Sequence, residues 1–191
     1  MITKLLNDIY DSGCIPNDLL KSIFIALPKK SRAVECEDHR TISLMSHMTK
    51  ILLRIIMRRM RSRIRPEISD EQCGFVEGKG TSNAIYILRT LIERSIEVKT
   101  DLYLCFIDYT KAFDNVNHQE LSKMLESLNI DSKDLRVIQN IYWQQTAAIR
   151  IDKKIGTFQK IKKSVGQGCV LSPDLFSLYC ESSFRSLKDT P

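Results

Sequence analysis

The sequence predicts an α+β fold that is rich in helix and contains a small antiparallel sheet. Three observations favour this class. Apolar residues recur at helical spacing in several separate segments, and short runs rich in β-branched and aromatic residues lie between them. The chain has 191 residues, of which 43% are hydrophobic and 27% charged, and this balance supports one buried core or two small lobes.

The N-terminal half alternates predicted helices with one strand. Apolar positions share a helical face before Gly13, which predicts a helix over residues 2–12. A buried strand over 22–27 ends at Pro28. The other elements expected here are a basic amphipathic helix, a glycine-containing loop and a helix capped by Thr81 or Ser82, over residues 46–65, 66–80 and 81 onward.

The C-terminal half combines a strand, a hairpin and three helices. The strand is expected over 102–109, paired with or lying beside a β-hairpin over 146–161 that has a glycine in its loop. Asn117, with a glutamate three residues later, has the form of a capping box. Further helices are expected from Asp131 and from Ser172, where Ser-Pro supplies an N-cap and a proline at the first helical position.

Positive charge is concentrated in one stretch of the chain. The formal net charge is +6 and the pI is about 9.0, which favours a polyanionic partner. From His39 to Pro66 there are eight Lys and Arg residues and no acidic one. Two interpretations remain open for this stretch: a contact with a phosphate backbone, or a solvated helix face balanced by acids elsewhere.

The cysteines and the apolar runs bear on where the protein resides. The six cysteines form no C-x-x-C pair and lack companion histidines, so neither a zinc site nor a disulfide framework is predicted. Reduced thiols in an intracellular protein, nuclear or cytoplasmic, are the simplest interpretation. No apolar stretch approaches the ~20 residues that a membrane span needs, and no signal peptide is evident, so neither membrane insertion nor secretion is expected.

Asp108 is the first candidate site residue, because it ends an apolar strand where an unpaired buried carboxylate would be costly. One interpretation places a positive group beside it. The other is an aspartate at a strand exit that caps the following turn. The residue by itself leaves both open.

The segments around Asp108 and Gln167 resemble two motifs of one enzyme family. Phe106 to Val116 contains every fixed position of D-x-x-K-A-F-D-x-V, the first catalytic motif of reverse transcriptases in its non-LTR, or LINE-type, form. Val165 to Pro173 is similar to the family's Q-G-x-x-x-S-P motif, which leads into a long palm helix. Chance agreement with both motifs in the family's order is improbable.

The resemblance implies the site of an RNA-directed DNA polymerase. In the family the first aspartate, here Asp108, binds both Mg²⁺ ions, and the carbonyl of the next residue, Tyr109, binds one of them. Phe113 matches the aromatic position beneath the incoming sugar, which selects deoxynucleotides. Gln167 and Gly168 would contact the nucleotide and the template, and Asp114 is expected to be structural.

Two weaker matches precede these motifs in the order that the family places its fingers. Residues 25–30 with 39–44 resemble P-K-x and Y-R-P-I-S-L, and residues 71–81 resemble Q-x-G-F-x-x-G-x-x-T. The first would hold the triphosphate through Lys29, Lys30 and Arg40. The nucleic-acid-binding candidates, from the second match and from the basic helix, are Arg54, Arg58, Arg59, Arg61, Gln72, Gly74, Phe75 and Lys79. The implied partners are an RNA template, a DNA primer and a dNTP, with Mg²⁺ as cofactor.

The resemblance covers about residues 21–190 and implies part of a right-hand polymerase, with fingers at about 1–100 and a partial palm at about 101–191. The family's third motif, two adjacent aspartates, is expected after the Ser172 helix, and the chain reaches Pro191 without it. Gly166 stands where an arginine is usual, and Thr41 where a proline is usual. These departures put efficient catalysis in doubt, and because the two adjacent aspartates are absent, the 191-residue chain alone is expected to be inactive.

Three hypotheses follow for the function. The first is a reverse transcriptase domain that carries out template-directed phosphoryl transfer from a dNTP to a primer 3′-end. The second is a non-catalytic remnant of the element that binds nucleic acid. The third is a pseudogene fragment that does not fold stably.

Overall fold

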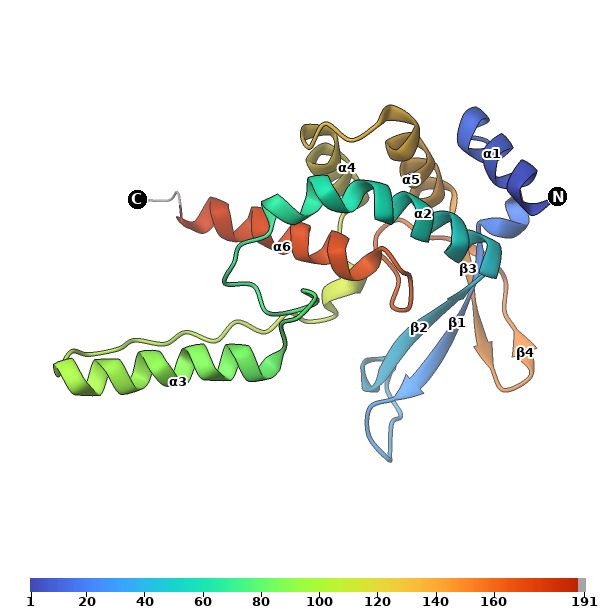
Figure 1. The fold of residues 1–191 in the computed structure, drawn as a ribbon. Helices are drawn as coiled ribbons and strands as arrows, with labels where there is room; N and C mark the ends of the chain where they lie inside the picture. Colours follow the sequence, from blue (N-terminus) through green and yellow to red (C-terminus); the bar gives the residue numbers. More distant parts are fainter. Residues whose placement is uncertain (189–191) are drawn as a thin grey trace.

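The helical layer of the molecule is organised around α2 (His47–Ile64), which lies among the other core helices (Figure 1). The computed structural model describes residues 1–188 and the side chains of residues 1–185. The helix begins after Ser46, whose hydroxyl accepts the Met48 amide at 3.2 Å. Seven α2 residues are buried along one side: Thr49, Leu52, Leu53, Ile56, Met57, Met60 and Ile64. The predicted basic amphipathic helix is confirmed.

Four more helices complete the core, and their starts follow the predicted signals closely. They are α1 (Ile2–Ser12), α4 (His118–Ser127), α5 (Ser132–Gln144) and α6 (Ser172–Lys188). Gly13 ends α1 with φ 74° and donates its amide to Ile9 O at 2.8 Å. Asn117 and Asp131 are the N-caps of α4 and α5, as predicted.

The sheet is mixed, with strand order β2-β1-β3-β4 and with β5 also paired to β3. Its strands are β1 (Lys21–Pro28), β2 (His39–Met45), β3 (Thr146–Ile151), β4 (Lys154–Ile155) and β5 (Gln159–Lys160). The predicted hairpin is confirmed, because β3 pairs antiparallel with β4 and β5. The α+β class is confirmed, but the sheet is mixed where an antiparallel one was expected, since β1 and β3 come from separate hairpins and pair in parallel.

One hydrophobic core joins the helices to the near end of the sheet. Ile56 of α2, Val137 of α5 and Leu175 of α6 are fully buried in it, and Leu20 and Val165 connect it to β1 and to the loop before α6. The sheet extends away from this core, so the β1–β2 and β3–β4 turns project below the helical layer in Figure 1. None of the described helices is both long and apolar enough to cross a membrane.

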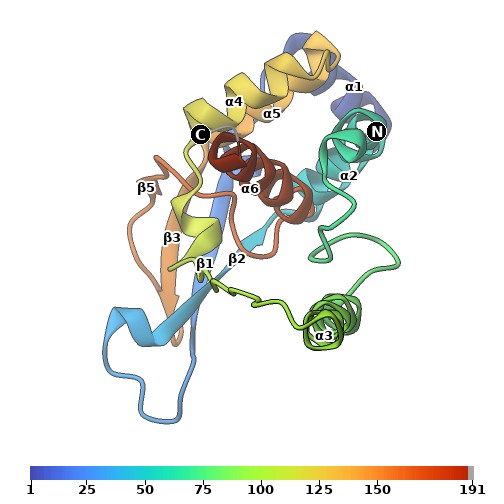
Figure 2. The same ribbon diagram turned by 90° about the vertical axis from the view of Figure 1, so that its left-hand side faces the viewer.

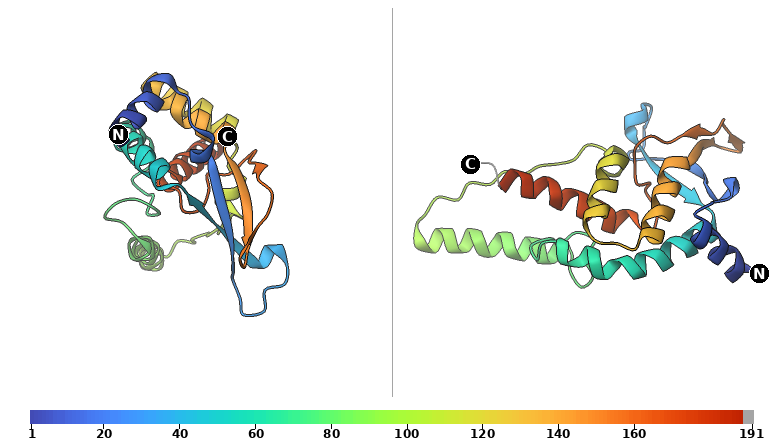
Figure 3. Two further views of the ribbon diagram at one scale, coloured as in Figure 1. Left: turned by 90° about the vertical axis from the view of Figure 1, so that its right-hand side faces the viewer. Right: turned by 90° about the horizontal axis from the view of Figure 1, so that it is seen from above.

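The remaining segment, residues 81–111, forms an arm that lies outside the core. It consists of α3 (Thr81–Val98) and an extended chain that returns beside the helix (Figures 1 and 3). In the end-on view of Figure 2, α3 stands apart from the other helices. No residue of the arm is buried. The N-cap of α3 is Gly80, not Thr81 or Ser82, and its amide is held by Asn83 Oδ1 at 2.9 Å.

The predicted strand over 102–109 does not form. These residues are exposed and carry no ladder hydrogen bond, and β3 pairs with β1, β4 and β5 instead. The reason is physical: an apolar, β-prone sequence becomes a strand only against a partner strand, and the described residues place none beside it. The expected pairing of this segment with the hairpin region is therefore wrong.

Candidate functional site

The segment with the first motif leaves the arm and turns back into the core. Asp108 lies in the exposed extended chain, and a short 3₁₀ helix follows over Ala112–Asn115. The ring of Tyr109 meets Phe176 of α6 edge-on, with centroids 6.3 Å apart. Burial raises the pKa of the Tyr109 phenol, and the neighbouring Cys180 raises it further. Asp108 is thus anchored on its C-terminal side only.

An aromatic cluster joins two of the sequence motifs to helix α6, which follows the third. Phe113, from the first motif, stacks on Phe176 with centroids 4.7 Å apart and planes at 29°. Phe75, from the loop before α3, meets Phe113 edge-on at 5.7 Å. Such pairs add to area burial because ring edges and faces carry opposite partial charge. Segments that are 38 and 63 residues apart in sequence therefore share one contact, with Phe113 at its centre.

The loop that carries Gln167 is fixed by β2. The Ser43 amide donates to Gln167 O at 2.7 Å. Gly168 has φ 102°, and a Cβ there would lie 3.0 Å from Ser43 O, so this position needs glycine for contact with β2. The close backbone approach that the glycine permits is thus made to the protein's own strand.

Two polar groups hold the same loop from the other side. His118 of α4 is buried, and its Nε2 donates to Ser164 O at 2.7 Å. Burial lowers the pKa of this imidazole, and the bond to Ser164 opposes the shift. Ser172, expected as the N-cap, is instead the first residue of α6, and its hydroxyl donates to the carbonyls of Val165 and Gly166.

Asp114 lies where basic side chains from three segments of the chain converge. Burial raises the pKa of its carboxyl, while Lys111, a hydrogen bond from Ser164, Lys163 and Lys29 act in the opposite direction. Lys111 is the fixed lysine of the D-x-x-K-A-F-D-x-V motif, and Lys29 was a predicted nucleotide-binding residue. No pattern signalled Lys163, because only the fold brings residues of three segments to one carboxylate.

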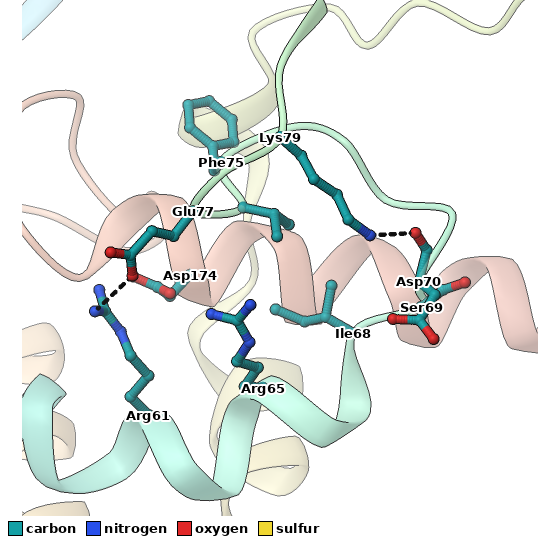
Figure 4. A pocket seen from close by; sticks show the side chains of 10 residues that line it. Arg61, Arg65, Ile68, Ser69, Asp70, Phe75, Glu77, Lys79 and Asp174 are labelled. Carbon is teal, nitrogen blue, oxygen red and sulfur yellow. Dashed lines mark hydrogen bonds and ion pairs between the residues drawn. The ribbon is translucent and has the colours of Figure 1, made fainter. Parts of the chain in front are cut away.

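A cavity of about 510 Å³ opens between the end of α2, the loop over 68–79 and the start of α6 (Figure 4). It gathers three predicted nucleic-acid-binding residues, Arg61, Phe75 and Lys79. Arg65, which belongs to the basic stretch, also lines it, as does Asp174, which was not among the predicted site residues. Burial raises the pKa of the Asp174 carboxyl, and Arg61 partly offsets this.

The cavity is close to electrically balanced. Arg61 pairs with Glu77 at 3.8 Å, and Lys79 donates to the backbone carbonyl of Asp70. Asp70, Glu77 and Asp174 thus face Arg61, Arg65 and Lys79. The cavity therefore suits a partly polar, partly aromatic ligand better than a bare phosphate group.

The other predicted residues divide into exposed and internally engaged ones. Arg54 and Arg58 are exposed on α2 and, at helical spacing, lie on the same side as Arg61 and Arg65. Arg59 instead pairs with the buried Asp134 at 3.0 Å and lies 4.9 Å from the Tyr10 ring, so it joins α2 to α5 and α1. Gln72 and Gly74 lie in the loop over 68–79 without lining the cavity, and Arg40 is exposed on β2.

Lys29 and Lys30, the candidates for the triphosphate, are held within the β1–β2 turn. Lys29 Nζ donates to Glu37 O at 2.8 Å, and Lys30 pairs with Asp38 at 2.7 Å. Three acids of the same turn, Glu35, Glu37 and Asp38, offset its three basic residues. These cations are exposed, yet their charge is already partly neutralised.

The acidic residues of the described chain do not make a two-metal site. No group of three or more His, Cys, Asp or Glu side chains within residues 1–188 could hold a metal ion. Asp108 and the Tyr109 carbonyl supply one anionic ligand, whereas two ions about 4 Å apart need several. The residues present therefore do not fit a pair of Mg²⁺ ions.

The comparisons with known proteins agree with the motifs. The family model for reverse transcriptase (RNA-dependent DNA polymerase) matches residues 27–191. The chain belongs to the reverse transcriptase family. This reverse transcriptase sequence is 28% identical over 180 residues to the Pol polyprotein of the type-1 retrotransposable element R2 of Popillia japonica. It is 26% identical over 181 residues to the RNA-directed DNA polymerase from mobile element jockey of Drosophila funebris.

A third relative is the transposon TX1 uncharacterized 149 kDa protein of Xenopus laevis, 25% identical over 178 residues. These non-LTR retrotransposon relatives cover 93–94% of the chain, and the chain covers 14–25% of their lengths. The chain thus spans a quarter or less of the proteins it matches. The family generally uses divalent metal ions with an RNA template, a DNA primer and nucleotides.

Proposed function

We propose that this chain supplies the fingers, about residues 1–100, and part of the palm, about residues 101–191, of an RNA-directed DNA polymerase from a non-LTR retroelement. The aromatic cluster carries the proposal. Phe113 of the first motif touches Phe75, which lies in the match over residues 71–81, and Phe176, which lies in the helix that the Q-G-x-x-x-S-P motif leads into. The contact between these segments supports their belonging to one site.

The proposed roles follow the motifs. In a complete site, Asp108 and the Tyr109 carbonyl would help to hold Mg²⁺, which would supply charge stabilisation for phosphoryl transfer. Phe113 acts as the steric gate under the nucleotide sugar, and its stacking on Phe176 supports a fixed ring position. The remaining nucleotide-binding residues are Gln167, Gly168, Lys29, Lys30 and Arg40.

The proposed nucleic-acid surface is the exposed arginine side of α2 with the loop that follows it. Arg54, Arg58 and Arg61 are oriented for phosphate contacts, whereas the pairing of Arg59 with Asp134 gives it a structural role. The proposed loop contacts are Gln72, Gly74, Phe75 and Lys79.

A binding experiment tests the nucleic-acid part of the proposal. The measurement is fluorescence anisotropy of a labelled RNA–DNA primer–template over a series of salt concentrations. The variant Arg54→Gln/Arg58→Gln/Arg61→Gln should bind at least about tenfold more weakly at low salt and show a flatter salt slope, because fewer counterions are released. A matched control, Arg89→Gln/Arg94→Gln/Lys123→Gln, removes as much charge from α3 and α4. Equal losses of primer–template affinity in both variants would contradict the proposal that α2 carries the nucleic-acid surface.

A second candidate function is a nucleic-acid-binding protein without catalysis. The observation in its favour is that Asp108 belongs to no group of three or more His, Cys, Asp or Glu side chains, among the described residues, that could hold a metal ion. Primer extension with dNTPs and Mg²⁺ separates the two. We expect no primer extension from the 191-residue chain. Activity should appear only when further polypeptide supplies additional metal-binding carboxylates, and Asp108→Ala should abolish that activity. Template-dependent synthesis by this chain alone would contradict the assignment of its metal ligands.

A further inference from the structure

A second concentration of positive charge lies in the hairpin that contains β4 and β5. This basic hairpin, residues 150–163, holds six Lys and Arg residues and one acid, Asp152, for a net charge of +5. The stretch from His39 to Pro66 carries +8. Because the whole chain carries +6, all remaining residues together carry −7. Charge is therefore segregated into two surfaces, whereas an ordinary solvated surface intersperses both signs.

The cations of the basic hairpin are exposed, and most of them form no ion pair or side-chain hydrogen bond with the described residues. Every residue from Ile149 to Lys160 is exposed. Of the six basic residues, only Lys163 has a side-chain partner within the part of the chain that the structure describes, Asn115 Oδ1 at 2.8 Å. No ion pair among the described residues involves the other five: Arg150, Lys153, Lys154, Lys160 and Lys162.

The neighbouring turn of the sheet shows what a neutralised surface looks like. Strands β1 and β3 are parallel, with Ile25 beside Arg150, so their turns project at the same end of the sheet (Figure 1). In the β1–β2 turn, Lys30 pairs with Asp38 and Lys29 bonds to a carbonyl. The basic hairpin has the same place and exposure but lacks the balancing acids.

Apolar side chains are interleaved with these cations. Cross-strand partners lie on the same face of a hairpin. Arg150 is paired with Ile155 and Ile151 with Lys154, so each face presents one cation beside one isoleucine. Phe158 is 40% exposed, and Lys21 Nζ lies 5.7 Å from its ring centroid.

We propose that the basic hairpin binds a single nucleic-acid strand, with its cations on the phosphates and with Phe158 and the isoleucines against unpaired bases. A duplex would offer the cations its phosphates but would hide its base faces, whereas a single strand exposes both. The inference rests on the proposed function only in taking nucleic acid as the polyanion. It adds a surface that is separate from α2.

The test uses the intact chain and a 20-nucleotide fluorescein-labelled RNA of unstructured sequence. In the variant Lys153→Gln/Lys154→Gln/Lys160→Gln/Lys162→Gln, affinity at low salt should fall by at least about tenfold, and the salt slope should flatten by up to about 3, because four phosphate contacts are lost. The control Lys4→Gln/Arg89→Gln/Lys99→Gln/Lys123→Gln lowers the net charge equally and should change affinity less than about threefold. Circular dichroism checks that both variants are folded.

A second measurement reports position. With p-azidophenylalanine in place of Phe158, irradiation should attach the RNA covalently at the hairpin, whereas the same group in place of Tyr103 on the arm should give no adduct. An unchanged affinity in the hairpin variant, with the α2 variant weakened, would overturn this inference and leave the proposed function standing. The inference would also be overturned if the hairpin variant lost binding to phosphatidylserine vesicles but kept its affinity for RNA. If the hairpin variant binds RNA more weakly and the α2 variant binds it normally, the result would support the inference and contradict the proposed nucleic-acid surface on α2.

Discussion

Helices α2 and α3 have the same length of 18 residues and opposite environments. Helix α2 buries seven residues, whereas α3 buries none, although α3 is the more apolar of the two. Ile85, Leu91 and Ile96 of α3 are all more than half exposed. The contrast shows that apolar residues allow a helix to be buried, but the helix becomes buried only where another surface packs against it.

Local interactions hold the arm together in place of a core. Helix α3 has ion pairs between Arg89 and Glu93 at 2.7 Å and between Arg94 and Glu97 at 2.6 Å, and all four side chains are exposed. Each such pair contributes only about 0.2–0.5 kcal/mol. Most of the stability of helices in proteins comes from packing an apolar face against other elements, and α3 buries no residue. The core and the arm should therefore respond very differently to the same chemical change.

The largest expected effect comes from one leucine deletion made in both helices. Leu53 of α2 is 1% exposed and Leu91 of α3 is 51% exposed. Leu53→Ala should lower the free energy of unfolding by about 2–5 kcal/mol, because it removes buried methyl groups and leaves a cavity. Leu91→Ala should change it by less than about 0.5 kcal/mol. Urea unfolding followed by circular dichroism measures both, and similar losses would break the comparison between core and arm.

A smaller, pH-dependent effect should belong to the core alone. Burial lowers the pKa of His118, so below its ordinary value of about 6.5 the unfolded chain binds a proton that the folded chain resists. Protons then favour unfolding, so the contribution is present above pH 6.5 and is lost as the pH falls below it.

His118→Gln tests this. The amide can still donate to Ser164 O but does not titrate, so the fall in stability between about pH 7 and pH 5 should flatten. The control is His47→Gln, since His47 is exposed at the start of α2. If the dependence of stability on pH flattens in His47→Gln and not in His118→Gln, the buried imidazole of His118 does not contribute to pH-dependent stability as argued.

The fold could be predicted where the signal was local. Periodicity and caps placed α1, α2, α4 and α5 correctly, because Gly13, Asn117 and Asp131 act on their own helix ends. Strand β2 was missed, and the strand over 102–109 was predicted but does not form. Both errors have one cause: a strand is defined by its neighbour, and β2 has β1 beside it whereas the arm segment has none.

The site could be predicted in its parts but not in its contacts. Resemblance supplied the motif residues and their order, yet it gave no sign that Phe113 stacks on Phe176. Arg59 was grouped with the other arginines because its partner, Asp134, is 75 residues away. Charge patterning also drew attention to α2 alone. The basic hairpin emerged only when ion pairs could be followed residue by residue.

The smallest expected effect on stability concerns the extended chain of the arm. Phe106 is 81% exposed and has no ring partner among the described aromatic contacts. Phe106→Ser should therefore change the free energy of unfolding by less than about 0.5 kcal/mol, while reducing the fluorescence of the dye ANS, which binds exposed apolar surface. Phe176→Ser serves as the control from the core side, because it breaks the stack with Phe113 and should cost about 1–3 kcal/mol. If Phe106→Ser proved as destabilising as Phe176→Ser, the ring would have to be covered in solution, and the arm would belong with the core.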